Sequence, residues 1–221
     1  MTAATSKANP AWHMYVPKSV TLTRAVWVLL LPLLIAIAPA QGESASAGDL
    51  MAALQRGGYV ILMRHASSPS AAPDAAHANT DNVHQERQLD QQGRSSARAM
   101  GEAFRRLKIV IGQVLSSPTY RALETVKVAG VGRPIPLPEL GESVPGMSAD
   151  KRAAWLRART AIPPAVGTNT LIVTHFPNIA EAFPRESTGL VEGEALILQT
   201  NDRGELSLVA RVKIDEWPTK Q

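Results

Sequence analysis

The chain has 221 residues, 45% of them hydrophobic, which is enough for one ordinary α/β domain and too few for two. It contains no cysteine, which excludes disulfides, thiolate metal sites, a cysteine nucleophile and a lipoprotein anchor. The formal net charge is +4, but residues 1–40 hold three basic and no acidic side chains, so the remainder has 20 basic and 19 acidic residues and a charge of +1. We therefore expect no nucleic-acid partner.

The first 40 residues have the pattern of a secretory signal peptide. Three basic residues precede an apolar run over residues 25–40, which ends in Ala-Pro-Ala, so cleavage is expected near Ala40. An uncleaved anchor is the alternative, but the run has 16 residues and contains Pro32, whereas a spanning helix needs about 20. The basic region is long, and Met14 offers a second start.

Export to the periplasm or the medium follows from this pattern, with no stable membrane anchor after cleavage. Residues 41–48 are small and polar and predict a flexible lead-in. The domain is then expected to span residues 49–221.

Helices and strands alternate along that domain. In chain order we predict a helix over 49–58 with Asp49 as N-cap, a buried strand over 59–63, a polar loop over 67–86, a helix over 91–109, a strand over 112–117, and a helix from Pro118 with Ser117 as N-cap. Next we predict a loop with an edge strand over 134–146 and an amphipathic helix over 148–160, anchored by Ala154, Trp155 and Leu156. These are followed by a buried strand over 168–175, a helix beginning at Pro177 and a β-hairpin over 194–214. This order predicts an α/β fold, a three-layer α/β/α sandwich with a mainly parallel sheet and a C-terminal β-hairpin.

Polar residues follow three of the predicted strands. Arg64 and His65 follow the first, the turn SSPTYR with Arg121 follows the second, and His175 follows a third. In open parallel sheets ligands bind beyond the carboxyl ends of the strands, so these side chains are expected to meet. Taken singly, each also fits a hydrogen-bonded loop residue or a surface cation. An arginine in the first turn of a helix, however, is disfavoured unless an anion joins it.

The stretches LMRHA, SSPTYRALET and LIVTHFPNI together resemble the signature of the histidine phosphatase superfamily, the phosphoglycerate mutase-like fold, in a small exported bacterial branch. The resemblance implies a metal-independent phosphatase that needs no cofactor. It implies that His65 is the nucleophile and forms a phosphohistidine, and that Arg64, Arg121 and His175 bind the phosphoryl oxygens. The implied substrate is a phosphorylated small molecule or cell-envelope phosphate.

Two further residues match weaker parts of that signature. Arg87 stands in an Arg-x-Leu sequence ahead of a glycine and a helix, where small phosphohistidine phosphatases place another phosphate ligand, although a solvated loop arginine fits equally well. Glu142, with Glu139 as the alternative, is the candidate general acid. His77 and His84 lie seven positions apart without a metal-ligand pattern, and a substrate lid is the expectation for their loop.

The sequence departs from the superfamily pattern at two places. Ala66 replaces the usual glycine after the nucleophile, and Phe176-Pro177 replaces small residues after the second histidine, so no N–H is available at position 177. Two other hypotheses stay open: a phosphate-ligand binding module without turnover, and an unrelated α/β domain with chance motifs. The latter requires that Arg64, His65, Arg121 and His175 do not share a pocket.

Overall fold

The computed structural model describes residues 47–201 and 203–218. The predicted signal peptide and most of the predicted lead-in lie outside these residues. The helices are α1 (Ala47–Arg56), α2 (Gln91–Arg106), α3 (Tyr120–Ala129), the 3-10 helix η1 (Pro138–Leu140), α4 (Ala149–Thr160) and α5 (Phe176–Ala182). The strands are β1 (Tyr59–Arg64), β2 (Ile111–Ser116), β3 (Ile135–Pro136), β4 (Asn169–Thr174), β5 (Ala195–Thr200) and β6 (Leu206–Val212).

The six strands form one mixed sheet in the order β3-β2-β4-β1-β5-β6. Strands β3, β2, β4 and β1 are parallel, whereas β5 is antiparallel to β1 and pairs with β6 as the predicted hairpin. The sheet is therefore parallel only on the side that the βα units build. The short edge strand predicted in the 134–146 loop is β3.

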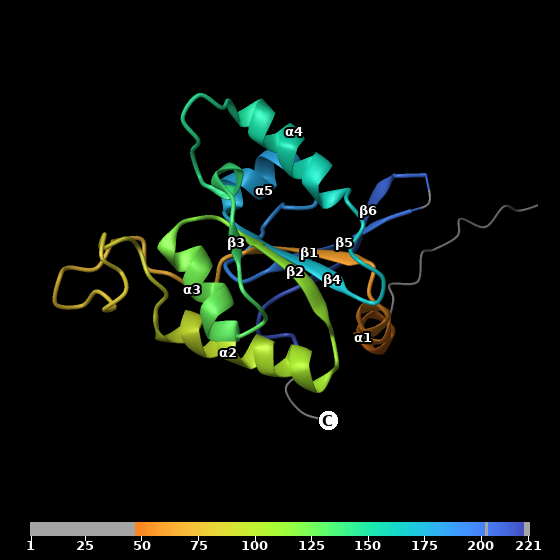
Figure 1. Cartoon of the computed structure of the whole chain (residues 1–221), viewed down its shortest axis with the longest axis horizontal. Coiled ribbons are helices and arrows are strands. Elements are labelled where there is room, and N and C mark those ends of the chain that lie inside the picture. Colours follow the sequence, from red (N-terminus) through yellow and green to blue (C-terminus); the bar gives the residue numbers. More distant parts are fainter. Residues whose placement is uncertain (1–46, 202, 219–221) are drawn as a thin grey trace, which may run out of the picture. The chain divides into compact units, whose positions relative to one another are not determined.

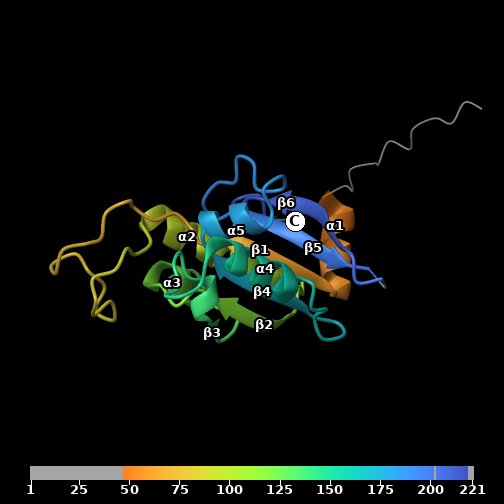
Figure 2. The same cartoon turned by 90° about the horizontal axis from the view of Figure 1, so that it is seen from above.

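Helices cover both faces of the sheet, as the prediction required. Figure 1 shows α2 and α3 on one face and α4 and α5 on the other, and Figure 2 shows α4 lying over the sheet. The alternation of β1 divides its side chains between two cores, with Ile61 and Met63 on the α2 face and Val60 and Leu62 on the α4 face. A strand buried on both faces explains the unbroken apolar run YVILM.

Three local predictions were wrong. Helix α3 begins at Tyr120 with Thr119 as its N-cap, because Ser117 continues the strand ladder by donating its N–H to the Val173 carbonyl at 2.8 Å. Helix α1 begins before Asp49, which lies in its first turn, where a carboxylate is favourable. Helix α5 begins at Phe176, with His175 as its N-cap.

The apolar face of α4 also differs from the prediction. Ala153 and Leu156 are buried, while Ala154 is exposed and Trp155 only half-buried. Arg152 occupies part of the inner face and pairs with Glu181 of α5 at 2.9 Å, so an ion pair contributes to the contact between α4 and α5.

Within the described residues, no helix combines the length and the hydropathy needed to cross a bilayer.

Candidate active site

Two buried histidines stand side by side because they extend neighbouring parallel strands. Arg64 pairs with Thr174 in the β1–β4 register, and the His65 N–H donates to the Thr174 carbonyl at 3.0 Å. The next residues, His65 and His175, are 2% and 0% exposed, and their ring centroids are 5.2 Å apart. The carboxyl edge of the sheet therefore presents an imidazole pair.

Arg121 joins the two imidazoles. Its position in the first turn of α3 aims the guanidinium at them, and its side chain is buried. Nε donates to His65 Nε2 at 3.1 Å, and one terminal nitrogen, Nη2, lies 3.0 Å from His175 Nδ1. The same Nη2 is 2.8 Å from Glu142 Oε1. The cation that seemed misplaced at a helix N-terminus thus has an anionic partner. That partner is Glu142.

The hydrogen bonds fix the tautomer of each imidazole. His65 Nδ1 is 2.8 Å from the Ala66 carbonyl, which can only accept, so Nδ1 carries the proton and the lone pair of Nε2 accepts from Arg121. His175 Nδ1 accepts from Arg121, so its Nε2 carries the proton and donates to Ser117 Oγ at 2.9 Å. Both rings are consequently neutral, and Nε2 of His65 is unprotonated.

The surroundings keep both rings neutral well below neutral pH. Burial lowers the pKa of His65 from 6.5 to about 4; the Ala66 hydrogen bond opposes this shift, and the charge of Arg121 adds to it. Burial and then Arg121 lower the pKa of His175 to about 2. Arg64 and Arg87 also lower both pKa values, which shows that their charges act at this edge of the sheet.

Glu142 lies at the rim of the site. Its side chain is 48% exposed, and Oε1 is 3.5 Å from His175 Nδ1 in addition to its contact with Arg121. Two bonds hold the preceding backbone: the Thr174 hydroxyl donates to the Leu140 carbonyl at 2.7 Å, and Asn178 Nδ2 donates to the Gly141 carbonyl at 2.8 Å. Of the two candidate acids, Glu142 is the one in contact with Arg121 and His175.

Arg64 and Arg87 stand beside this centre. Arg64 pairs with Glu192 at 3.0 Å, and its guanidinium carbon lies 5.9 Å from the ring centroid of Phe176. Phe176 is 40% exposed and gives the rim an apolar side. Arg87 donates from Nε to the Pro69 carbonyl at 2.6 Å and from Nη2 to the Ser68 carbonyl at 3.1 Å. All six site residues predicted from the sequence therefore lie at one edge of the sheet, with Arg87 held on the loop between β1 and α2.

The structure adds residues that the motifs did not single out. Ser117 Oγ accepts a hydrogen bond from His175 Nε2, and Thr125 Oγ1 accepts one from the Ala66 N–H at 3.1 Å. Serines and threonines in helices and turns are too common for the sequence to have indicated these two. Glu86 accepts from the Tyr120 N–H at 2.9 Å and so caps α3, because the hydroxyl of Thr119 lies instead 3.3 Å from His175 Nε2.

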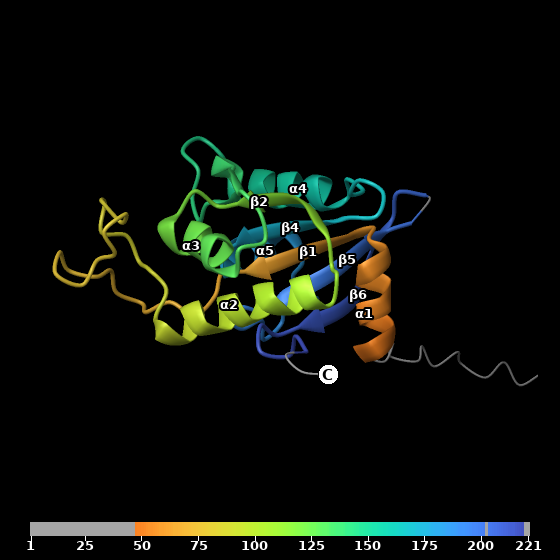
Figure 3. The same ribbon diagram turned by 60° about the horizontal axis from the view of Figure 1, so that its bottom comes forward.

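The loop between β1 and α2 is tied to α3. Figure 3 shows it extending from the edge of the sheet beside α3. Asp81 accepts from the Tyr120 hydroxyl and pairs with Lys127, while Asn79 donates to Glu124 Oε1 at 2.9 Å. Of the loop histidines, His77 pairs only with Asp74 at 2.7 Å. No group of three or more potential metal ligands occurs within residues 47–201 and 203–218.

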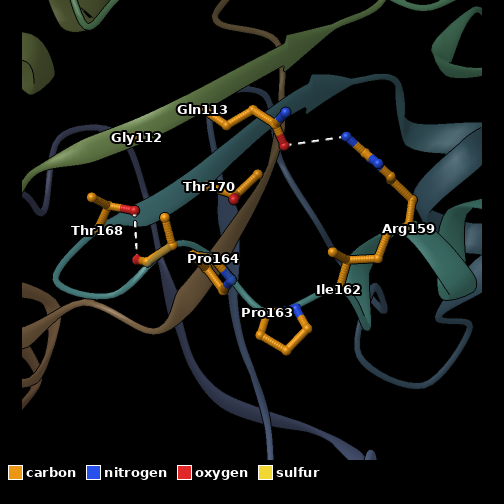
Figure 4. A pocket seen from close by; sticks show the side chains of 9 residues that line it. Gly112, Gln113, Arg159, Ile162, Pro163, Pro164, Thr168 and Thr170 are labelled. Atoms are coloured by element: carbon orange, nitrogen blue, oxygen red, sulfur yellow. Dashed lines mark hydrogen bonds between the residues drawn. The ribbon is translucent and has the colours of Figure 1, made fainter.

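A separate cavity of about 260 Å³ opens at the opposite ends of β2 and β4. Figure 4 shows Gln113, Thr168 and the two prolines at positions 163 and 164 around it, with Arg159 bound to Gln113 at 3.2 Å. Its one basic side chain is already paired, and no histidine or carboxylate lines it. None of the site residues predicted from the sequence lines this cavity.

Comparisons with known proteins found a family model and several solved structures that are similar to this chain. Residues 60–146 match the family model described as "Histidine phosphatase superfamily (branch 1)", a span that includes Arg64, His65, Arg87, Arg121 and Glu142. No curated protein matches the chain.

Solved structures with a similar fold include the protein histidine phosphatase SixA complexed with tungstate, at 22% identity and a TM-score of 0.52, covering 71% of this chain and 97% of that one. A putative phosphohistidine phosphatase SixA from Agrobacterium tumefaciens has 17% identity and a TM-score of 0.48, covering 70% and 97%. A phosphoserine phosphatase mutant from Entamoeba histolytica, in complex with phosphoserine, has 15% identity and a TM-score of 0.48, covering 72% and 98%.

Proposed function

The chain belongs to the histidine phosphatase superfamily, and on that premise we propose that it is a metal-independent phosphatase that hydrolyses a phosphomonoester or similar substrate through a phosphohistidine. The observation that supports this most directly is the protonation state of His65. Its Nε2 is an unprotonated nucleophile, since Nδ1 holds the proton and the pKa is about 4. No step of general-base activation is then needed before attack.

In the first step His65 Nε2 attacks phosphorus, the N–P bond forms and the bond to the leaving oxygen breaks. The guanidinium groups of Arg64, Arg87 and Arg121 are placed to meet the charge on the phosphoryl oxygens, a task that fixed cations perform well in a buried site. When the phosphoryl group takes the place of the Glu142 carboxylate beside Arg121, Glu142 takes up a proton from the solvent, and its carboxyl gives that proton to the leaving oxygen.

In the second step water attacks phosphorus and the N–P bond breaks. The Glu142 carboxylate takes the proton from the water, inorganic phosphate is released, and His65 returns to its neutral form. The resemblance implies that His175 binds a phosphoryl oxygen, but its Nδ1 accepts from Arg121 and its Nε2 donates to Ser117. In this scheme His175 therefore holds Arg121 in place and donates no hydrogen bond to the phosphoryl group.

The substrate that we propose is a small phosphorylated molecule outside the cytoplasm, with cell-envelope phosphates as one class. This location rests on the signal-peptide pattern of residues 1–40. The half-exposed Phe176 beside Arg64 favours substrates with an apolar group next to the phosphate.

Hydrolysis of p-nitrophenyl phosphate in the presence of a chelator tests the proposal, together with acid-quench trapping of labelled phosphoryl protein. We expect turnover without metal, and we expect His65→Ala to lose both turnover and label while it still binds tungstate. Tungstate binding by the wild-type protein without turnover would instead identify a phosphate-binding module that lacks activity.

A further inference from the structure

Glu192 forms the one ion pair that Arg64 makes within the described residues. The carboxylate Oε1 lies 3.0 Å from Nη2 of Arg64, and the two side chains are about equally buried, at 24% and 25% exposure. The other contacts of the guanidinium are weaker. Nη1 reaches the Leu190 carbonyl only at 3.5 Å, and Nε is buried without a hydrogen-bond partner.

Glu192 is itself held by a second bond. Its Oε2 accepts from the backbone N–H of Ser68 at 3.3 Å, so one carboxylate spans from the arginine to the loop that follows the nucleophile. The segment around Glu192 is fixed to the same stretch of backbone, because the Gly193 N–H donates to the His65 carbonyl at 2.9 Å and the Arg64 N–H donates to the Glu194 carbonyl at 3.1 Å. Glu192 therefore cannot move independently of the residues that it orients.

Resting on the proposed function, we infer that Glu192 is a positioning residue that holds the Arg64 guanidinium ready for the phosphoryl group. An arginine side chain loses rotamer entropy when it binds a ligand, and a fixed partner removes part of that loss beforehand. The charge of Glu192 acts in the opposite direction, since it lowers the positive potential that attracts the anion. We expect the positioning of Arg64 by Glu192 to affect anion binding more than the negative charge of Glu192 does, because no other strong contact of the guanidinium keeps Arg64 at the site.

The test measures the affinity for tungstate by calorimetry and the kinetics with p-nitrophenyl phosphate. Glu192→Ala removes the carboxylate that accepts from Arg64. Glu192→Met also removes it but keeps the length of the side chain, and this variant replaces the Ala variant in the test if the latter does not fold. We expect either change to weaken tungstate binding about tenfold, as loss of a charge-assisted hydrogen bond predicts, and the kinetic loss to fall mainly on KM rather than kcat. Glu192→Gln keeps an acceptor and is expected to recover most of the affinity.

A double-mutant cycle shows whether Glu192 acts through Arg64. In an Arg64→Ala background, Glu192→Ala should change tungstate affinity by less than about twofold. The matched control is Glu181→Ala, which removes a carboxylate from a similarly buried arginine pair, with Arg152, between α4 and α5. It should leave tungstate affinity unchanged even if the melting temperature falls.

The possible results distinguish a failure of the proposed phosphatase function from a failure of the positioning role of Glu192. If the wild-type protein binds no tungstate, the proposed phosphatase function fails. If it binds tungstate and the Glu192 variants bind equally well or more tightly, the positioning role is wrong and the function stands. An undiminished effect of Glu192→Ala in the Arg64→Ala background, or a Gln variant as weak as the Ala variant, also overturns the positioning role.

Discussion

Replacing His65 by Gln should change how the stability of the fold depends on pH. The substitution removes one buried imidazole and leaves an amide oxygen that can still accept from Arg121. In the unfolded chain the imidazole binds a proton near pH 6.5, whereas in the folded chain it does so only near pH 4. Because the folded pKa is the lower one, the stabilising contribution is present above pH 6.5 and is lost as pH falls toward 4.

The size of the effect follows from linkage between proton binding and folding. With pKa values of 6.5 and about 4, the wild-type protein should lose about 2 kcal/mol of unfolding free energy from this group between pH 7 and pH 5, and about 3 kcal/mol by pH 4. The Gln variant lacks this loss. The titrations of the other histidines and of the carboxylates are common to both proteins and cancel in the difference.

Urea denaturation of both proteins at intervals between pH 5 and pH 7 measures that difference. The gap between wild type and variant should shift by about 2 kcal/mol in favour of the variant as pH falls. Curves that stay parallel within about 0.5 kcal/mol would mean that the fold does not hold His65 neutral, and the argument for a ready nucleophile would then fail.

Two further predictions concern the helices that support the site. Gly101→Ala should destabilise the protein by about 2 kcal/mol, because the new Cβ would lie 1.8 Å from the Ala129 carbonyl oxygen of α3; urea denaturation that instead shows a gain would contradict the close packing of α2 on α3. Glu86→Ala should cost about 1 kcal/mol by removing the carboxylate that caps α3 at the Tyr120 N–H, and an unchanged denaturation midpoint would show that this cap is unimportant.

The sequence predicted the sheet well because its central strands contain short apolar runs, YVILM in β1 and LIV in β4. Both strands are buried, and such runs are typical of strands that are covered on both faces. The order of the strands was not predictable in the same way. That β5 would lie antiparallel beside β1 depends on long-range pairing, which the local pattern of a hairpin does not specify.

The site was predictable to the extent that strand ends determine it. His65, Arg121 and His175 follow strands in the sequence, so the rule for parallel sheets brings them together. Glu192 follows no such rule, since it lies 128 positions from Arg64 in a loop before an antiparallel strand. The predicted start of α3 was wrong because serine is a common N-cap residue, whereas Ser117 forms the hydrogen bond of a strand residue.

The pairing of β1 with β4 determines how far apart the two histidines lie. Since His65 and His175 each follow the last residue of adjacent parallel strands, the backbone ladder sets the 5.2 Å between their rings, and no loop takes part in that measurement. The loops that shape the rim, before α2 and before α4, can therefore change in length and sequence while the imidazole spacing stays constant. A fold that separates the two histidines from these loops can acquire new substrates through changes in the loops alone, while the histidine pair stays as it is.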